Sequence, residues 1–217
     1  MRVYKERTYR GRAARKGLVG FRVAVRETDL WIQAASDLSA LAREAVIQAR
    51  ARLERYIERF PEFARTLAPW PDPGPAPNVV RAMVRAGRAA GVGPMAAVAG
   101  AIAEAVGTAL LAESPEVVVE NGGDVFFAVS GPFTVGVFAG RSPLSDRVGM
   151  RISGTGKPMG LCTSSGTVGH SLSAGRADAA CILADSCSLA DAAATACGNR
   201  VQDEADISRA LPPPKTP

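Results

Sequence analysis

Histidine and cysteine, which often build metal and nucleophile sites, are scarce here. The 217 residues include one histidine and four cysteines. The cysteines are Cys162, Cys181, Cys187 and Cys197. They lie 19, 6 and 10 positions apart and include no C-x-x-C pair. This spacing argues against a zinc knuckle and against a disulfide framework.

Long apolar runs are also absent. No stretch of about 18 consecutive apolar residues occurs, since the longest candidate, Val92 to Leu111, is mainly Ala and Gly and contains Glu104. We therefore expect a buried helix there and no membrane partner. The basic first residues are not followed by the apolar segment that a secretory signal requires. Secretion is thus unsupported, and we expect a cytoplasmic protein.

Charge is distributed unevenly. The chain has a net charge of +5, but residues 1–26 hold nine basic side chains and one acidic side chain, so the remaining residues carry 17 basic and 20 acidic groups. The basic segment lacks the interleaved glycine and aromatic residues typical of nucleic-acid binding. A nucleic-acid partner is therefore not expected, whereas contact with a partner or with a second copy of the chain stays open. Hydrophobic residues make up 47% of the chain, which excludes a largely disordered protein.

The length suits one domain covering residues 1–217. Alternating apolar residues predict a hairpin over residues 21–32, and Asp37 is the expected N-cap of an amphipathic helix that reaches Phe60. Six prolines between residues 61 and 77 predict a stiff crossover. Residues 78–200 form the main body, and residues 201–217 form a loose tail.

Helices and strands are segregated within the main body. Asn78 is the expected cap of a short helix, and Pro94 opens a second helix built from small side chains. A last helix is expected from about Ser188 to Gly198. Six runs predict strands: 117–119, 125–129, 133–138, 150–152, 159–162 and 179–183. The first three runs read as an antiparallel meander. The pattern predicts an α+β fold with an antiparallel sheet and packed helices.

One polar segment, residues 162–178, is the strongest candidate for ligand binding. It contains six hydroxyl side chains, three glycines, the single histidine and one arginine between two predicted strands. Glycine amides, hydroxyls and a guanidinium together suit a phosphate-bearing ligand. The alternative is a polar loop with no ligand. The candidate binding residues are Thr163, Ser164, Ser165, Gly166, Thr167, His170 and Arg176.

Two residues of the last helix suit a hard cation. Asp191 and Thr195 are four positions apart, so the carboxylate and the hydroxyl share one face of a helix and suit Mg²⁺. A capping interpretation competes, because Ser188 and Asp191 also have the spacing of an S-x-x-D capping box. The two readings stay open at this point.

Cys162 opens a different kind of chemistry. It precedes the polar segment directly, where amides and Arg176 are expected to stabilise a thiolate. A protein that handles thiol or persulfide sulfur through Cys162 is therefore one alternative. The competing interpretation is a cysteine buried at the end of a strand.

Four motifs, in order along the chain, resemble the ApbE family of flavin transferases. They are Asn121-Gly122-Gly123-Asp124, Thr163-Ser164-Ser165-Gly166, His170, and the helix Ala190-Asp191-Ala192-Ala193-Ala194-Thr195-Ala196. The small-residue helix at residues 93–100 is similar to the family helix against which the flavin lies. The likeness covers about residues 78–200 and implies a T-fold-related architecture.

The resemblance implies magnesium-dependent transfer of FMN from FAD to a Ser or Thr of an acceptor protein. Asp191 and Thr195 would then be magnesium ligands, and Gly122 and Gly123 would let the backbone approach the flavin. The other flavin contacts are Asn121 and Asp124, with Thr163, Ser164 and Gly166 lining the pyrophosphate. His170 is a candidate catalytic residue, and Cys162 is the candidate catalytic residue of the sulfur-handling alternative.

This chain departs from the family after the histidine. The family's I-D-P-x-T-G segment is replaced by Ser171-Leu172-Ser173-Ala174-Gly175. The resemblance therefore predicts a short branch that binds FAD or FMN and leaves transferase activity open. A non-catalytic nucleotide-binding or interaction protein is the remaining alternative.

Overall fold

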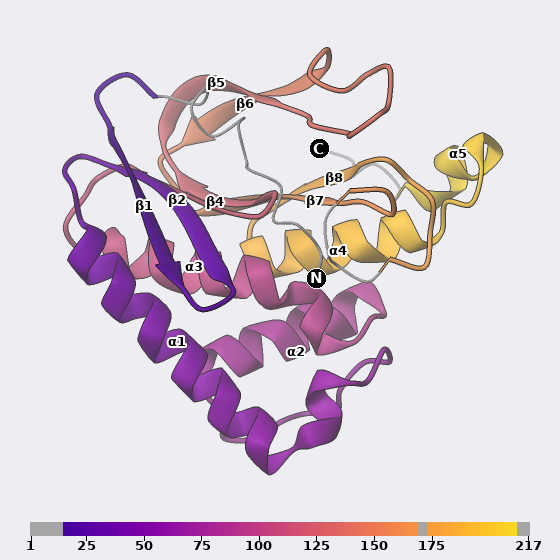
Figure 1. Cartoon of the computed structure of the whole chain (residues 1–217), viewed down its shortest axis with the longest axis horizontal. Coiled ribbons are helices and arrows are strands. Elements are labelled where there is room, and N and C mark those ends of the chain that lie inside the picture. Colours follow the sequence, from indigo (N-terminus) through magenta and orange to yellow (C-terminus); the bar gives the residue numbers. More distant parts are fainter. Residues whose placement is uncertain (1–14, 169–172, 212–217) are drawn as a thin grey trace.

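An antiparallel sheet separates a layer of helices from a two-stranded ribbon in the computed structural model (Figure 1), which describes residues 15–168 and 173–211. The order of the six-stranded sheet is β1-β2-β3-β4-β7-β8. The strands are β1 (Val19–Val25), β2 (Thr28–Ala34), β3 (Val117–Asn121), β4 (Asp124–Ala128), β5 (Ser130–Gly136), β6 (Gly149–Thr155), β7 (Met159–Ser164) and β8 (Ala180–Ala184).

The long helices lie on one side of this sheet, and one short helix lies beyond its end (Figure 1). They are α1 (Ser39–Arg59), α2 (Asn78–Ala90), α3 (Val98–Leu110), α4 (Cys187–Asn199) and α5 (Ile207–Ala210), with short 3₁₀ helices at Pro61–Ala64, Pro94–Ala97 and Glu204–Asp206. The α+β class with an antiparallel sheet is therefore confirmed. In the described part of the chain no single helix is long and apolar enough to span a membrane; α2 and the 94–110 helical segment meet that test only together and are bent by 106° at their break.

Strand alternation explains why both faces of the central strands are buried. On β4, Phe126 and Ala128 belong to the core under the helices, whereas Phe127 packs with the β5–β6 ribbon. Successive side chains of a strand point to opposite faces, so the sheet is sandwiched between two apolar layers.

The predicted three-stranded meander is wrong beyond its first pair. β3 pairs with β4, but β5 pairs with β6 in a separate sheet, and β7 takes the place beside β4. The chain turns away at Gly131, whose φ of 80° favours glycine, and Pro132 has no N–H to donate to a neighbouring strand. The ribbon therefore folds over the face of the sheet opposite the helices (Figure 1).

Two predicted caps are displaced. α1 begins at Ser39, whose N–H donates to Asp37 Oδ1 at 2.9 Å, and Leu38 occupies the N-cap position. Asn78 is the first residue of α2 rather than its cap, and the cap position belongs to Pro77. Apolar periodicity, which extends over many residues, placed both helices correctly. Their first residues were predicted less well, because a cap depends on only one or two residues.

The proline-rich crossover packs on the helix layer. Phe63 is fully buried, and its ring lies 5.0 Å from that of Tyr56 and 5.4 Å from that of Trp70, centroid to centroid. These edge-on aromatic contacts fix the crossover against α1.

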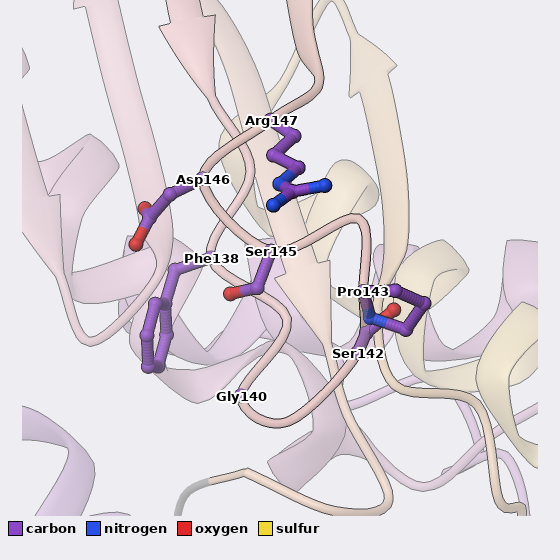
Figure 2. A pocket seen from close by; sticks show the side chains of 7 residues that line it. All are labelled: Phe138, Gly140, Ser142, Pro143, Ser145, Asp146 and Arg147. Atoms are coloured by element: carbon purple, nitrogen blue, oxygen red, sulfur yellow. The ribbon is translucent and has the colours of Figure 1, made fainter.

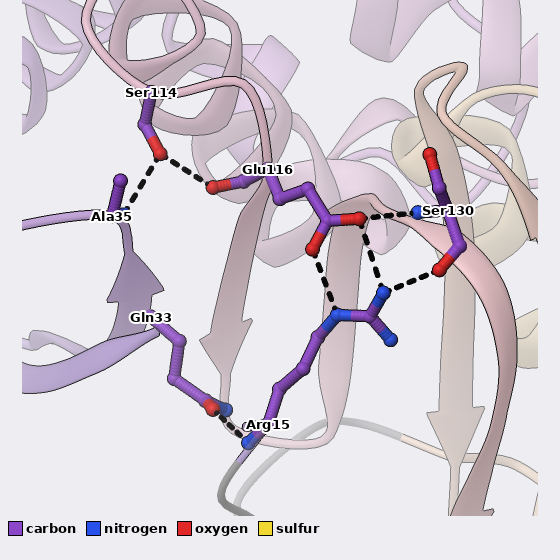
Figure 3. Close-up of polar contacts among 6 residues, drawn as sticks. All are labelled: Arg15, Gln33, Ala35, Ser114, Glu116 and Ser130. Carbon is purple, nitrogen blue, oxygen red and sulfur yellow. Dashed lines mark hydrogen bonds and ion pairs between the residues drawn. The ribbon is translucent and has the colours of Figure 1, made fainter. Parts of the chain in front are cut away.

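Arg15 anchors the start of the described chain (Figure 3). Its guanidinium forms a bidentate pair with Glu116, at 2.9 and 3.0 Å, and also donates to the Ser130 carbonyl. The Ser130 N–H donates to Glu116 Oε1 at 2.6 Å, and the Arg15 N–H donates to Gln33 Oε1 at 2.8 Å. The chain that enters β1 is thereby tied to β2, to the start of β3 and to the start of β5.

Candidate functional site

The turn between β3 and β4 needs both of its glycines. Gly122 has a φ of 71° and Gly123 a φ of 115°, values that L side chains rarely adopt. Asn121 and Asp124 close the turn as a cross-strand pair. The Asn121 side-chain amide donates to the Ala99 carbonyl at 3.0 Å, which ties the turn to the first turn of α3.

The same turn lies against the end of β7. Val125 pairs with Leu161 across β4 and β7, so the strands bring the turn toward residues 162–164. A Cβ added at Gly123 would lie 3.6 Å from the Thr163 carbonyl oxygen. Two motifs that are about 40 residues apart in the sequence therefore meet through their backbones.

Gly100 lets α3 and α4 touch. A Cβ added at this position would lie 2.4 Å from the Cys187 carbonyl oxygen and 2.8 Å from Asp191 Cβ. The Gly100 N–H donates to Asp191 Oδ2 at 2.8 Å in a buried contact. The small-residue helix therefore accommodates another backbone at Gly100.

The capping-box interpretation of Asp191 is wrong. The N-cap of α4 is Ser186, whose hydroxyl accepts from the Leu189 N–H at 3.4 Å. The Ser188 N–H donates to Glu104 Oε2 at 2.9 Å, not to Asp191. The Asp191 carboxylate is thus held by α3 and is not used to cap its own helix.

Glu104 is a structural residue of the site that the sequence did not single out. Its Oε2 also accepts from the hydroxyls of Ser186 and Ser188, at 2.9 and 2.7 Å. It is the one acidic residue in an otherwise apolar and small helix, which is the signal that could have found it. Glu104 fixes the N-terminus of α4, and with it the position of Asp191 one turn later.

Asp124 and Asp191 form a buried acidic pair. They are 8% and 9% exposed. Burial raises the pKa of Asp191 well above its ordinary value, and the Asp124 carboxylate raises it further, whereas hydrogen bonds from the Gly100 and Ala99 backbone oppose the shift. The site therefore has a negative potential that favours a proton or a cation.

The oxygen atoms present fit a hard cation. Thr195 lies one turn after Asp191 on α4 and is half-buried. Carboxylate and hydroxyl oxygens are ligands that Mg²⁺ accepts. In residues 15–168 and 173–211 no group of three or more His, Cys, Asp or Glu residues is arranged to hold a metal ion. A cation at Asp191 and Thr195 would therefore draw its other ligands from backbone, water or a bound phosphate.

Side-chain hydroxyls order residues 165–168, which directly follow β7. Ser165 Oγ accepts from the N–H groups of Thr167 and Val168 at 3.1 and 2.8 Å, and Thr167 Oγ1 donates to Asp178 Oδ1 at 2.8 Å. The Gly166 N–H donates to the Ala177 carbonyl at 2.9 Å. These bonds hold residues 165–168 in a turn and connect this turn to residues 177 and 178.

The remaining predicted binding residues lie around this turn. Thr163 Oγ1 is 3.2 Å from Cys181 Sγ, Ser164 is buried, and Arg176 is exposed. The Arg176 N–H donates to the Val201 carbonyl at 2.7 Å. His170 lies outside the described residues.

The C-terminal end of α4 contacts residues 174 and 175 of the polar segment. Asn199 Oδ1 accepts from the Ala174 N–H at 2.8 Å, and a Cβ added at Gly175 would lie 1.9 Å from the Gly198 carbonyl oxygen. One helix therefore carries Asp191 near its start and supports the loop that bears Arg176 at its end.

Cys162 has the surroundings of a core thiol. It is fully buried, its Sγ donates to the Cys187 carbonyl at 3.3 Å, and Cys187 Sγ lies 3.6 Å away. Burial raises the pKa of the Cys162 thiol well above its ordinary value, and the nearby Cys187, Asp124 and Asp191 raise it further. The predicted stabilisation of a Cys162 thiolate is therefore wrong.

A separate surface cavity lies in the β5–β6 loop (Figure 2). It has a volume of about 380 Å³. Figure 2 shows Phe138 and Asp146 together at one side and Arg147 pointing across the loop. The other lining residues are Gly140, Ser142, Pro143 and Ser145. A Cβ added at Gly140 would lie 2.6 Å from Val168 Cγ2, so this loop touches the polar segment. None of the predicted site residues lines the cavity.

The architecture matches a solved structure. The apo form of flavinyl transferase ApbE from Pseudomonas stutzeri aligns with a TM-score of 0.55 and 14% sequence identity, over 88% of this chain and 86% of that chain. The two proteins therefore share an α+β fold.

Sequence comparison specifies the family. The profile described as AbpE bacteria matches residues 11–213, and the chain belongs to this family of the ApbE-like superfamily. A UPF0280 protein of Methanopyrus kandleri is 45% identical over 199 residues, which cover 89% of this chain and 80% of that protein. A UPF0280 protein of Methanocella arvoryzae is 43% identical and covers 86% of this chain and 76% of its own length.

Proposed function

We propose that this protein binds a flavin nucleotide, FAD or FMN, where the β3–β4 turn, the end of β7 and the N-terminal turns of α3 and α4 meet. The observation that carries the proposal is the contact network among the motifs. Asn121 bonds to Ala99, Gly123 lies against Thr163, and Gly100 bonds to Asp191. Four segments far apart in the sequence thus lie together, and a solved protein with a similar fold is a flavinyl transferase.

The parts of this site have distinct roles in the proposal. The glycines of the turn allow close approach of a flat ring. The loop from Thr163 to Thr167 and the exposed Arg176 offer amides, hydroxyls and a guanidinium to phosphate groups. A divalent cation held by Asp191 and Thr195 would neutralise charge on a pyrophosphate.

The experiment is a titration of the purified protein with FAD and with FMN, with and without Mg²⁺. Binding should quench or shift flavin fluorescence and raise the unfolding temperature, since a ligand at 100 times its Kd adds about 2.7 kcal/mol to the free energy of unfolding. An unchanged melting temperature and unchanged fluorescence at millimolar flavin would refute the proposal.

Asp191→Asn tests the cation within this proposal. The variant should lose the dependence of FAD binding on Mg²⁺, because Asn supplies no charge to the metal. Asp185→Asn is the matched control, since Asp185 is an exposed aspartate just before the same helix. If Mg²⁺ dependence persists in Asp191→Asn, the metal assignment is wrong while flavin binding stands.

FMN transfer is the activity to test once binding is established. Incubation with FAD, Mg²⁺ and candidate acceptor proteins that contain Ser or Thr would release AMP and give a covalent mass increase of one FMN less one water if transfer occurs, because the acceptor hydroxyl forms a phosphoester with the FMN phosphate. Bound flavin without such an adduct would favour the non-catalytic nucleotide-binding alternative. An acceptor protein and a cytoplasmic location stay predictions.

A further inference from the structure

We propose that Asp124 is a third side chain of the cation site, with its carboxylate facing the divalent ion assigned to Asp191 and Thr195. This inference rests on the proposed function, because the ion is the one that the proposed function places there. It adds a residue of the β3–β4 turn to a site otherwise built on α4.

Strand alternation directs Asp124 toward α4. Phe126 and Ala128 on β4 face the helix layer and share its core cluster. Asp124 lies two residues before Phe126, so its side chain leaves the same face of the sheet. It therefore points toward the helices, away from the β5–β6 ribbon.

The neighbouring strand places this side chain beside the first turn of α4. β4 and β7 are antiparallel with Val125 opposite Leu161, so Asp124 comes next to Cys162. The Cys162 Sγ donates to the carbonyl of Cys187, the first residue of α4. Asp191 follows Cys187 by one helical turn and lies on the same side of the helix.

The two buried carboxylates, Asp124 and Asp191, favour a bound cation. Asp124 and Asp191 are only 8% and 9% exposed, and they lie on the neighbouring elements β4 and α4. Like charges buried together cost free energy unless a proton or a cation compensates them. Two carboxylates match the charge of one divalent ion, and the Thr195 hydroxyl adds a neutral oxygen ligand.

The backbone contact of Asp191 is compatible with this arrangement. Its Oδ2 accepts from the Gly100 N–H at 2.8 Å. A hydrogen-bonded carboxylate retains its second oxygen for a metal, and such bonds orient metal ligands in proteins. The residues of α3 thus position Asp191, whereas Asp124 supplies charge from the opposite element.

The test is direct binding of Mn²⁺ to the full chain in the absence of flavin, measured by electron paramagnetic resonance of free Mn²⁺ and by calorimetry. Asp124→Asn and Asp191→Asn should each weaken binding by roughly 10- to 100-fold, the range seen when groups that support a metal are changed. Glu120→Gln is the matched control. It removes a carboxylate from the same turn, while its amide oxygen can still accept from the Gly123 N–H, as Glu120 Oε1 does at 3.1 Å.

The outcomes separate this inference from the proposed function. Loss of binding in Asp191→Asn with wild-type affinity in Asp124→Asn overturns the inference and leaves the metal assignment intact. A wild-type protein that binds no Mn²⁺ overturns both the inference and the metal assignment, while flavin fluorescence quenching without metal would still support flavin binding.

A wild-type measurement guards against a folding defect. The ¹³C signals of the Asp124 and Asp191 carboxyl carbons should both shift on addition of Mg²⁺, at the same Mg²⁺ concentration. An Asp124 signal that stays unchanged while the Asp191 signal moves contradicts the inference without any variant. Asp124→Ser provides a second variant if circular dichroism shows that Asp124→Asn is unfolded.

Discussion

The backbone N–H of Gly100 donates to Asp191 Oδ2 at 2.8 Å, which joins two residues that are 91 positions apart. The contact exists because residue 100 has no Cβ, and α3 therefore approaches the first turns of α4. Most of the candidate site depends on this approach, since α4 carries Asp191 and Thr195.

Gly100→Ala should destabilise the protein by about 1–3 kcal/mol, the cost of forcing an extra methyl group into a packed interior. The added Cβ would lie 2.4 Å from the Cys187 carbonyl oxygen. This oxygen belongs to the backbone, so it cannot rotate out of the way as the end of a flexible side chain can. Urea unfolding measures the change. Gly136→Ala is the control, because nothing lies within 4 Å of a Cβ added there. Equal stability of the two variants would show that the α3–α4 contact is looser than described.

Glu104→Gln should lower the free energy of unfolding by about 1–2 kcal/mol, because charge-assisted hydrogen bonds to Ser186 and Ser188 become neutral ones. Thermal unfolding checks the change. Glu113→Gln, at an exposed position just beyond the same helix, should have little effect. A wild-type melting temperature in Glu104→Gln would mean that the N-terminus of α4 is fixed by packing alone.

Glu116 should make stability depend on acid pH. Its hydrogen bonds from Arg15 and Ser130 lower its pKa below 4.5. A carboxyl group whose pKa is lower in the folded state stabilises the protein above its unfolded pKa, and this contribution disappears as the pH falls through the folded pKa. Glu116→Gln should therefore cost about 1 kcal/mol at neutral pH and progressively less below pH 4.5.

Stability curves of wild type and Glu116→Gln between pH 2 and pH 7, measured by urea unfolding, test this expectation. The two curves should converge at the acid end. A constant difference across the range would contradict the assignment of the pKa shift to the Arg15 contact.

Cys162 should react slowly with alkylating agents. Its thiol is fully buried and its pKa is raised, so little thiolate exists at neutral pH. Cys181 is half-buried and serves as the internal comparison. Mass spectrometry after timed exposure to iodoacetamide gives each rate. Faster labelling of Cys162 than of Cys181 would revive the sulfur-handling alternative.

Local patterns predicted most of the elements. The alternation of Phe21, Val23 and Val25 and the six β-rich runs gave strands at the expected places, because burial on one face imposes a period of two. The sequence of each run does not show which other strand it pairs with. Nothing in residues 133–138 distinguishes a strand beside β4 from one that pairs with β6, and the difference is set by the turn at Gly131 and by the apolar face that the ribbon covers.

The sequence predicted which residues belong to the candidate site better than it predicted their hydrogen-bond partners. The motifs identified Asp191, but spacing alone offered Ser188 as its partner, whereas the structure joins it to Gly100 and joins Ser188 to Glu104, 84 residues away. Such partners are fixed by helix packing, which no local window contains. The roles of the predicted binding residues stay predictions until a ligand is measured.

The length of helix α4 sets the distance between the Asp191 carboxylate and the polar segment. Asp191 and Asn199 are eight residues apart, so about 12 Å of rigid helix separates the carboxylate from the residue that holds the Ala174 N–H of the polar segment. The length of α4 therefore also sets the distance between Asp191 and the loop that carries Arg176. Inserting a single residue between Ala192 and Gly198 would turn one end by about 100° relative to the other. The helix therefore allows substitutions at its half-buried positions but no change in its number of residues.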